Sequence, residues 1–139
     1  ESPTSCPALD SNTFCRGIVG ISVIDCAKPV LTSNTVHHMS IVAVEVLSGA
    51  EPVMRKNTIR DNQGPGITLN RCGSATVADN AVLDNQGIAA IVVEKESNPA
   101  IHGNDVQGGN IGILITGGRG IIWKNTISKC RTAGVQVCI

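Results

Sequence analysis

The sequence predicts an all-β solenoid: a right-handed parallel β-helix formed by one chain, with about six coils of about 23 residues each. An asparagine recurs at a nearly constant interval, and apolar residues keep fixed places around it. The asparagines are Asn12, Asn34, Asn57, Asn80, Asn104 and Asn125, separated by 22, 23, 23, 24 and 21 residues. Such a period indicates a unit that buries its apolar face by stacking on copies of itself.

The first predicted strand of each coil surrounds the asparagine. The third residue before it is Leu9, Leu31, Met54, Val77, Ile101 or Ile122, and the second residue after it is Phe14, Val36, Ile59, Val82, Val106 or Ile127. Both columns are apolar throughout. Stacked asparagines can pass amide hydrogen bonds from coil to coil, so we expect a structural role for this column rather than a catalytic one.

The second predicted strand follows a small residue. Two apolar columns there enclose a variable one, which reads Ser22, Glu45, Thr68, Val92, Leu114 and Gln136. This period of two is typical of a strand with one buried face, and its β-branched residues suit a sheet. Glycine and proline separate the strands, so each coil is expected to run strand, turn, strand, turn, and the crossover rule gives the right hand.

A leucine-rich repeat is the main alternative, because Leu9-x-x-Asn12-x-Phe14 and its later copies fit part of that motif. Leucine-rich repeats use the rest of the unit for a helix or a helical turn. Here that part is β-branched and glycine-rich, with no apolar spacing typical of a helix, which favours the β-helix.

Composition predicts one domain over residues 1–139 with no internal linker. The chain is 42% hydrophobic, and its 11 basic and 11 acidic side chains balance. No net field would attract nucleic acid or anionic lipid, and no stretch is long enough to span a membrane. The chain starts at Glu1 without a recognisable leader and ends in mid-strand at Val135–Ile139. We therefore expect a piece of a longer protein, with further coils or end-to-end self-association at the uncapped stack.

The cysteines do not form an obvious disulfide framework. Cys26 and Cys72 share a column but lie two coils apart, about 9.6 Å, which exceeds the reach of a disulfide. This pattern favours reduced thiols and a cytoplasmic or nuclear location, with secretion as the alternative. His37 lies one coil beyond Cys15, followed by His38, but no metal-binding spacing supports a site, so we expect no metal and no cofactor.

One tetrapeptide suggests a polar binding ridge. Asp61-Asn62-Gln63-Gly64 returns intact as Asp84-Asn85-Gln86-Gly87 one coil later. The candidate binding residues of this ridge are Asp61, Gln63, Asp84, Gln86, Asn110 and Arg131. Stacked amides and carboxylates can bind hydroxyl groups, backbone amides or calcium, although Asp, Asn and Gly are also common turn formers.

No catalytic residue is predicted. Polysaccharide-cleaving β-helices need clustered carboxylates on an outward strand face, and the outward column here holds only Glu45. A second candidate surface consists of Trp123 with Val92 and Leu114, which we expect to face outward. An exposed Trp beside Arg119 and Lys124 is a typical anchor of protein interfaces.

The segments 52–64 (PVMRKNTIRDNQG) and 98–106 (NPAIHGNDV) resemble parallel β-helix repeats of a family with several functions. This family includes carbohydrate-binding and sugar-hydrolase modules, periplasmic copper-accessory proteins, and F-box subunits that recruit substrates to ubiquitin ligases. The resemblance implies a non-enzymatic scaffold that binds another protein, with substrate recruitment in a ubiquitin ligase as one version. The alternative that it implies is a carbohydrate-binding or polysaccharide-cleaving β-helix.

Overall fold

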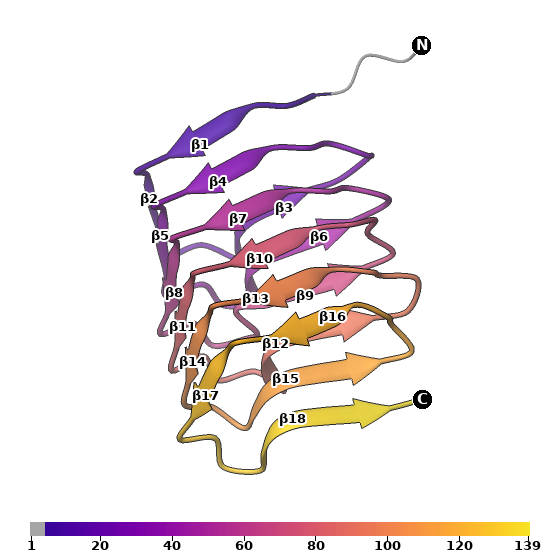
Figure 1. The fold of residues 1–139 in the computed structure, drawn as a ribbon. Helices are drawn as coiled ribbons and strands as arrows, with labels where there is room; N and C mark the ends of the chain where they lie inside the picture. Colours follow the sequence, from indigo (N-terminus) through magenta and orange to yellow (C-terminus); the bar gives the residue numbers. More distant parts are fainter. Residues whose placement is uncertain (1–4) are drawn as a thin grey trace.

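A computed structural model of the chain describes residues 5–139 as three parallel sheets of six strands, and each coil contributes one strand to each sheet (Figure 1). The first sheet contains β1 (Ala8–Asp10), β4 (Val30–Thr32), β7 (Val53–Arg55), β10 (Thr76–Ala78), β13 (Ala100–His102) and β16 (Ile121–Trp123). The second contains β2 (Thr13–Cys15), β5 (Thr35–His37), β8 (Thr58–Arg60), β11 (Ala81–Leu83), β14 (Asp105–Gln107) and β17 (Thr126–Ser128). The third contains β3 (Val19–Val23), β6 (Val42–Leu47), β9 (Ile67–Asn70), β12 (Ala89–Glu94), β15 (Ile111–Thr116) and β18 (Ala133–Cys138).

Each coil has three strands, so the prediction of two was wrong. The expected strand around the asparagine is divided into two by a corner immediately before that residue. The residue at this corner has a left-handed backbone in every coil, with φ between 52° and 68°. These corner residues are Ser11, Ser33, Lys56, Asp79, Gly103 and Lys124. One residue in this conformation turns the chain sharply, so the first and second sheets meet at an angle.

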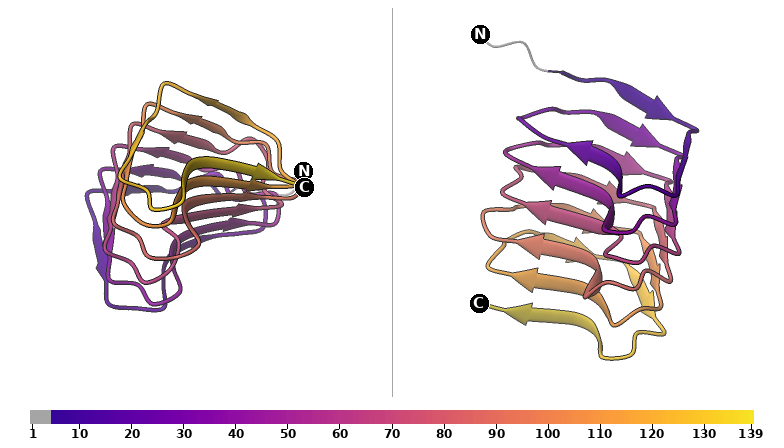
Figure 2. Two further views of the ribbon diagram at one scale, coloured as in Figure 1. Left: turned by 90° about the horizontal axis from the view of Figure 1, so that it is seen from below. Right: turned by 180° about the vertical axis from the view of Figure 1, so that it is seen from behind.

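The expected apolar columns form one continuous interior. Equivalent residues of successive coils are in register, for example Leu31 with Met54 and Val36 with Ile59. Most members of these columns are almost completely buried in a single cluster, whose partly buried edges include Leu9 and Ile127. Seen along the stack, the coils lie nearly over one another around this interior (Figure 2). Residues of the same columns are more exposed in the last coil, where Val137 is 71% exposed.

The asparagine column forms the expected ladder. Each side-chain Nδ2 donates to Oδ1 of the asparagine in the next coil, over five steps of 2.9 to 3.1 Å. Each of these Oδ1 atoms also accepts the backbone N–H of the preceding asparagine, and from Asn34 onward each Nδ2 also donates to a backbone carbonyl. Asn34, Asn57, Asn80 and Asn104 are buried. The ladder therefore satisfies polar groups at the corner between the first and second sheets.

A second, shorter ladder lies at the corner between the second and third sheets. Asn62 Nδ2 donates to Asn85 Oδ1 at 2.8 Å, and Asn62 Oδ1 accepts the backbone N–H of Met39. Both asparagines are at most 1% exposed. The second residue of the repeated tetrapeptide thus points inward and is structural, so it is not part of the polar ridge.

Candidate functional site

The outward residues of the polar ridge lie at the corner between the second and third sheets. Arg131 contacts two other members of the ridge, because its Nε donates to Asn110 Oδ1 at 3.0 Å and its Nη2 donates to Gln86 Oε1 at 3.3 Å. Gln86 Nε2 donates in turn to the backbone carbonyl of Asp84. The structure therefore brings Gln86, Asn110 and Arg131 together, as expected. Asn110 Oδ1 and Gln86 Oε1 already accept hydrogen bonds from Arg131, so fewer of their lone pairs are available to a ligand.

The two aspartates of the ridge are turn residues. Asp61 and Asp84 both have left-handed backbones, with φ of 53° and 52°. Asp61 forms an exposed ion pair with Arg60, at 2.7 Å. Exposed ion pairs of this kind contribute little to stability. Gln63 is exposed beside them, and its backbone N–H donates to the carbonyl of Met39.

The histidine and cysteine column is in the expected register, with Cys15 paired to His37. His37 Nδ1 contacts Nδ1 of His38, so one of the two nitrogens must donate and the other accept. Arg16 and Arg60 add positive charge around His37. Over residues 5–139, no three His, Cys, Asp or Glu side chains are arranged to hold a metal ion. The geometry thus describes two imidazoles that share a proton.

We predict that His37 makes stability sensitive to acid. Partial burial, then Arg60, His38 and Arg16, lower the pKa of His37 below its ordinary value of 6.5, while Asp61 opposes them. A lowered pKa means that the folded protein binds this proton less well than the unfolded chain. The resulting stability is present above pH 6.5 and is lost as the pH falls through the folded pKa. Thermal melting between pH 7.5 and 5 should show a smaller fall in Tm for His37→Gln than for the wild type.

The control for this prediction is His102→Gln, which changes a histidine on a different sheet. This variant should keep the pH-dependent stability that comes from His37. The Tm of His102→Gln should therefore fall with decreasing pH as the Tm of the wild type does. Parallel curves for the wild type and His37→Gln would contradict the assignment.

Val92 and Leu114 are not an exposed patch, so that expectation was wrong. They are neighbours on β12 and β15, as expected, but are only 5% and 4% exposed. With Ala89 and Ile111 they form a small apolar cluster that is separate from the main interior. They also belong to the third sheet, whereas Trp123 belongs to the first. The alternation of the strand correctly excluded them from the main interior but could not show that they are buried in a cluster of their own.

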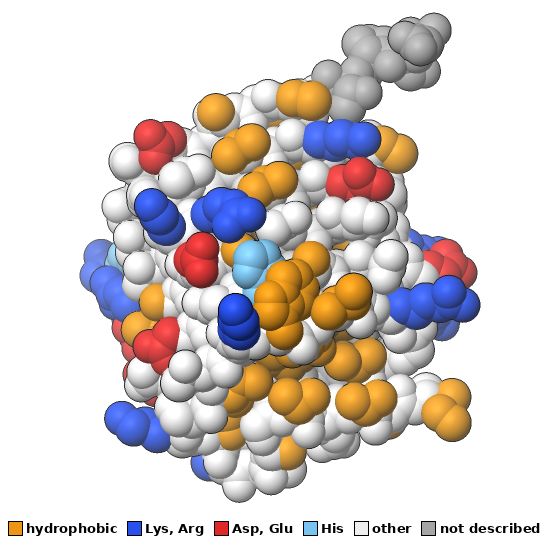
Figure 3. Space-filling model, in the orientation of Figure 1, with side chains coloured by type: hydrophobic (Ala, Val, Ile, Leu, Met, Phe, Trp, Pro, Cys, Tyr) orange, Lys and Arg blue, Asp and Glu red, His pale blue; other side chains and the backbone are white. Residues whose placement is uncertain are grey.

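Trp123 lies on the outer face of the first sheet. Its ring stacks on that of His102, its partner on β13, with centroids 4.2 Å apart and planes at 16°. Trp123 remains 40% exposed, and Ile121 on the same strand is 69% exposed. Figure 3 shows hydrophobic side chains gathered beside a histidine on this face, with basic side chains next to them. Arg55, on β7 of the same sheet, forms an exposed ion pair with Asp79, at 3.5 Å.

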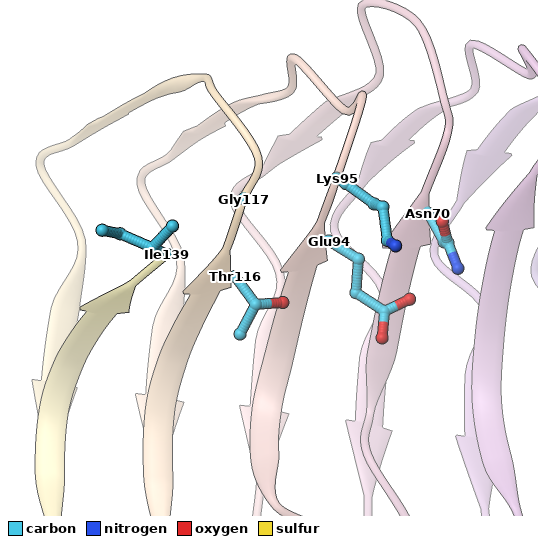
Figure 4. Close-up of a pocket in the computed structure, with 6 residues that line it drawn as sticks. All are labelled: Asn70, Glu94, Lys95, Thr116, Gly117 and Ile139. Atoms are coloured by element: carbon cyan, nitrogen blue, oxygen red, sulfur yellow. The ribbon is translucent and has the colours of Figure 1, made fainter.

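A hollow of about 400 Å³ lies on the third sheet at the carboxyl ends of its strands (Figure 4). Its lining residues are Asn70, Glu94, Lys95, Thr116, Gly117 and Ile139. The repeat pattern did not predict this site, because the variable outward column of Thr68, Val92 and Leu114 lies two positions before Asn70, Glu94 and Thr116. The next outward positions, at the ends of β9, β12 and β15, are the signal that could have identified these residues.

The stacked coils, the three parallel sheets and the outward side-chain columns define the protein as a parallel β-helix. Comparison of the sequence with protein families finds a match to a family described as "right handed beta helix region" over residues 4–138. The chain therefore belongs to the right-handed β-helix family. No curated protein and no solved structure matches the chain at a significant level. Over residues 5–139 the structure contains no helix long and apolar enough to cross a membrane.

Proposed function

We propose that this β-helix is a non-enzymatic scaffold that binds another protein through the outer face of its first sheet. The observation that carries the proposal is the stacked pair of Trp123 and His102 beside the exposed Ile121. Trp, with Tyr and Arg, is enriched among the energetic anchors of protein interfaces, where a few side chains supply most of the binding energy. A partly exposed aromatic ring held flat on a rigid sheet loses little conformational freedom on binding.

The charge around this patch favours an acidic partner. Lys124 follows Trp123 directly, and Lys56 and Arg55 lie on earlier coils near the same corner. Asp79 neutralises Arg55, which leaves the two exposed lysines as a basic rim. A segment with an apolar anchor and acidic flanking residues would complement this surface. Substrate recruitment for a ubiquitin ligase is one version of this function, supported by the resemblance of the repeats.

We predict that Trp123→Ala removes binding of the partner. Loss of an interface anchor typically costs about 2 kcal/mol or more, which corresponds to a roughly thirtyfold weaker complex. Affinity capture with quantitative mass spectrometry should show proteins that are retained by the wild type and lost by Trp123→Ala. Co-capture of ubiquitin-ligase subunits in the same set would support the ligase version.

The matched control is the double variant Gln63→Ala, Gln86→Ala, which alters the polar ridge and leaves the first sheet intact. It should retain the same proteins as the wild type. If Trp123→Ala retains them too, the first sheet is not the binding face. A glycan array tests the carbohydrate alternative, and glycan binding that depends on Gln63 and Gln86 would favour that function over the scaffold.

A further inference from the structure

A row of exposed isoleucines runs along the corner between the second and third sheets. The members of this isoleucine row, Ile18, Ile41 and Ile88, are 68%, 60% and 60% exposed. The backbone N–H of Ile41 donates to the carbonyl of Ile18 in the preceding coil, at 3.1 Å. The register of β9 with β12 places Ile88 beside Gly64, which follows Ile41 in the stack. The row therefore reads Ile, Ile, Gly, Ile in four successive coils, and apolar side chains gathered in this way mark an interaction surface.

A column of charged and polar side chains lies next to the isoleucine row, at the start of the same corner. The members of this corner column, from the first coil to the fourth, are Arg16, His38, Asp61 and Asp84. All four are exposed and have a left-handed backbone, with φ between 52° and 58°, so their side chains leave the corner in the same direction. Asp61 pairs with Arg60, whereas Arg16 and Asp84 belong to none of the ion pairs within residues 5–139. The column thus has an unpaired positive charge at one end and an unpaired negative charge at the other.

We propose that this corner binds a second copy of the chain, in an antiparallel dimer whose twofold axis crosses the isoleucine row between the second and third coils. Rotation about this axis places the first coil against the fourth and the second against the third. Arg16 then faces Asp84 of the second copy. His38, a hydrogen-bond donor, faces the carboxylate of Asp61 of the second copy. Each contact occurs twice, as in every isologous interface, so the corner column is complementary to itself.

The isoleucine row is complementary to itself in the same arrangement. Ile18 packs against Ile88 of the second copy. Ile41 packs over Gly64 of the second copy, where the row has no side chain. Because coils are spaced about 4.8 Å apart in both copies, the four positions stay in step along the contact. The contact covers only four coils, which places the dimer among the small and weak specific interfaces.

The corner column selects this register over the neighbouring ones. If the axis passes through the third coil, Asp61 faces Asp61 of the second copy. If it passes through the second coil, His38 faces its own equivalent and Asp84 has no partner. Like charges that face each other across an interface are unfavourable. Only the axis between the second and third coils gives each member of the column an attractive partner.

Sedimentation velocity of the 139-residue chain over a range of concentrations tests this proposal. The wild type should form a reversible dimer with a dissociation constant in roughly the micromolar range, as expected for a small interface. Asp84→Arg should weaken the dimer roughly tenfold or more, because it opposes Arg16 of the second copy, and Arg16→Asp should do the same. The double variant Arg16→Asp, Asp84→Arg exchanges the two charges and should restore the dimer.

Two isoleucine variants form a matched pair that locates the interface. Ile41 and Ile121 are 60% and 69% exposed but lie on different surfaces. Ile41→Ser should weaken the dimer roughly tenfold or more, whereas Ile121→Ser, on the first sheet, should leave it unchanged. Trp123→Ala should also leave it unchanged, so loss of the dimer and loss of the partner bound by the first sheet are separate results.

Three results would refute the dimer at this corner. The first is a chain that stays monomeric at every concentration. The second is a dimer that keeps its affinity in both Asp84→Arg and Arg16→Asp, or that the double variant does not restore. The third is a dimer that Ile121→Ser weakens and Ile41→Ser does not, because the two copies would then meet through the first sheet.

Discussion

Replacing Asn80 by leucine should destabilise the protein more than any single change on its surface. The Asn80 side chain accepts two hydrogen bonds from Asn57, through the backbone N–H and Nδ2, both at 3.0 Å. It donates two more, to Asn104 Oδ1 at 3.0 Å and to the Met54 carbonyl at 3.1 Å. Leucine has nearly the same shape but can make none of these bonds, so buried polar groups in two neighbouring coils lose partners.

We expect a loss of about 3–5 kcal/mol in the free energy of unfolding, because each buried group left without a partner costs about 1–3 kcal/mol. Urea unfolding followed by circular dichroism measures this loss. The expected effect is large because coils interact only with their neighbours, and Asn80 connects the two halves of the stack.

Asn12→Leu provides a matched control at the exposed end of the same ladder. Asn12 donates to Asn34 Oδ1 but accepts no ladder bond among the described residues, and it is exposed to solvent. Water can replace the lost bonds there, so the expected loss is below about 1 kcal/mol. Equal losses for Asn12→Leu and Asn80→Leu would show that the ladder does not stabilise the interior as described.

The coil repeat and its interior could be predicted because both follow from periodicity. A residue that recurs about every 23 positions must occupy the same place in each coil, and alternation assigns inward and outward positions. The register of Val36 with Ile59 and the burial of both confirm this reasoning. These features depend on spacing along the chain and not on the exact path of the backbone.

The three-strand coil could not be predicted in the same way. The corner before each asparagine is occupied by residues as different as Lys56, Asp79 and Gly103, all with positive φ. A lysine in a sequence does not predict a positive φ, because residues other than glycine rarely adopt a left-handed backbone conformation. The asparagine ladder stabilises the corner through contacts between coils, so the turn is a property of the stack.

The candidate sites were predicted only in part, for a related reason. The sequence placed Gln86, Asn110 and Arg131 in one region, which their hydrogen bonds confirm. Exposure depends on packing in three dimensions, and Val92 and Leu114 pack with Ala89 and Ile111, so they were wrongly placed in an open patch. The hollow lined by Asn70 depends on the shape of the surface at the strand ends, which only atomic positions can show.

Replacing Gly64 by alanine is the second change for which we expect a large effect. Gly64 is buried at the corner between the second and third sheets, where it crosses the backbone of the preceding coil. A Cβ at this position would lie 1.7 Å from the carbonyl oxygen of Ile41 and 2.7 Å from its carbonyl carbon. Because these are backbone atoms, the overlap can be relieved only by separating two coils. We expect a loss of about 3 kcal/mol in unfolding free energy, the upper part of the range for an overpacked site.

Gly17→Ala is the matched control, because Gly17 lies near the same corner in the first coil. A Cβ there would lie 3.4 Å from the sulfur of Met39, at the flexible end of a side chain. With room available, alanine restricts the unfolded chain and should stabilise the protein by about 0.4–1 kcal/mol. The two variants should therefore shift the urea midpoint in opposite directions. If both variants shift the urea midpoint in the same direction, the close crossing at Ile41 is not the reason for glycine at this corner. The structural explanation for Gly64, the glycine of the repeated tetrapeptide, would then be wrong.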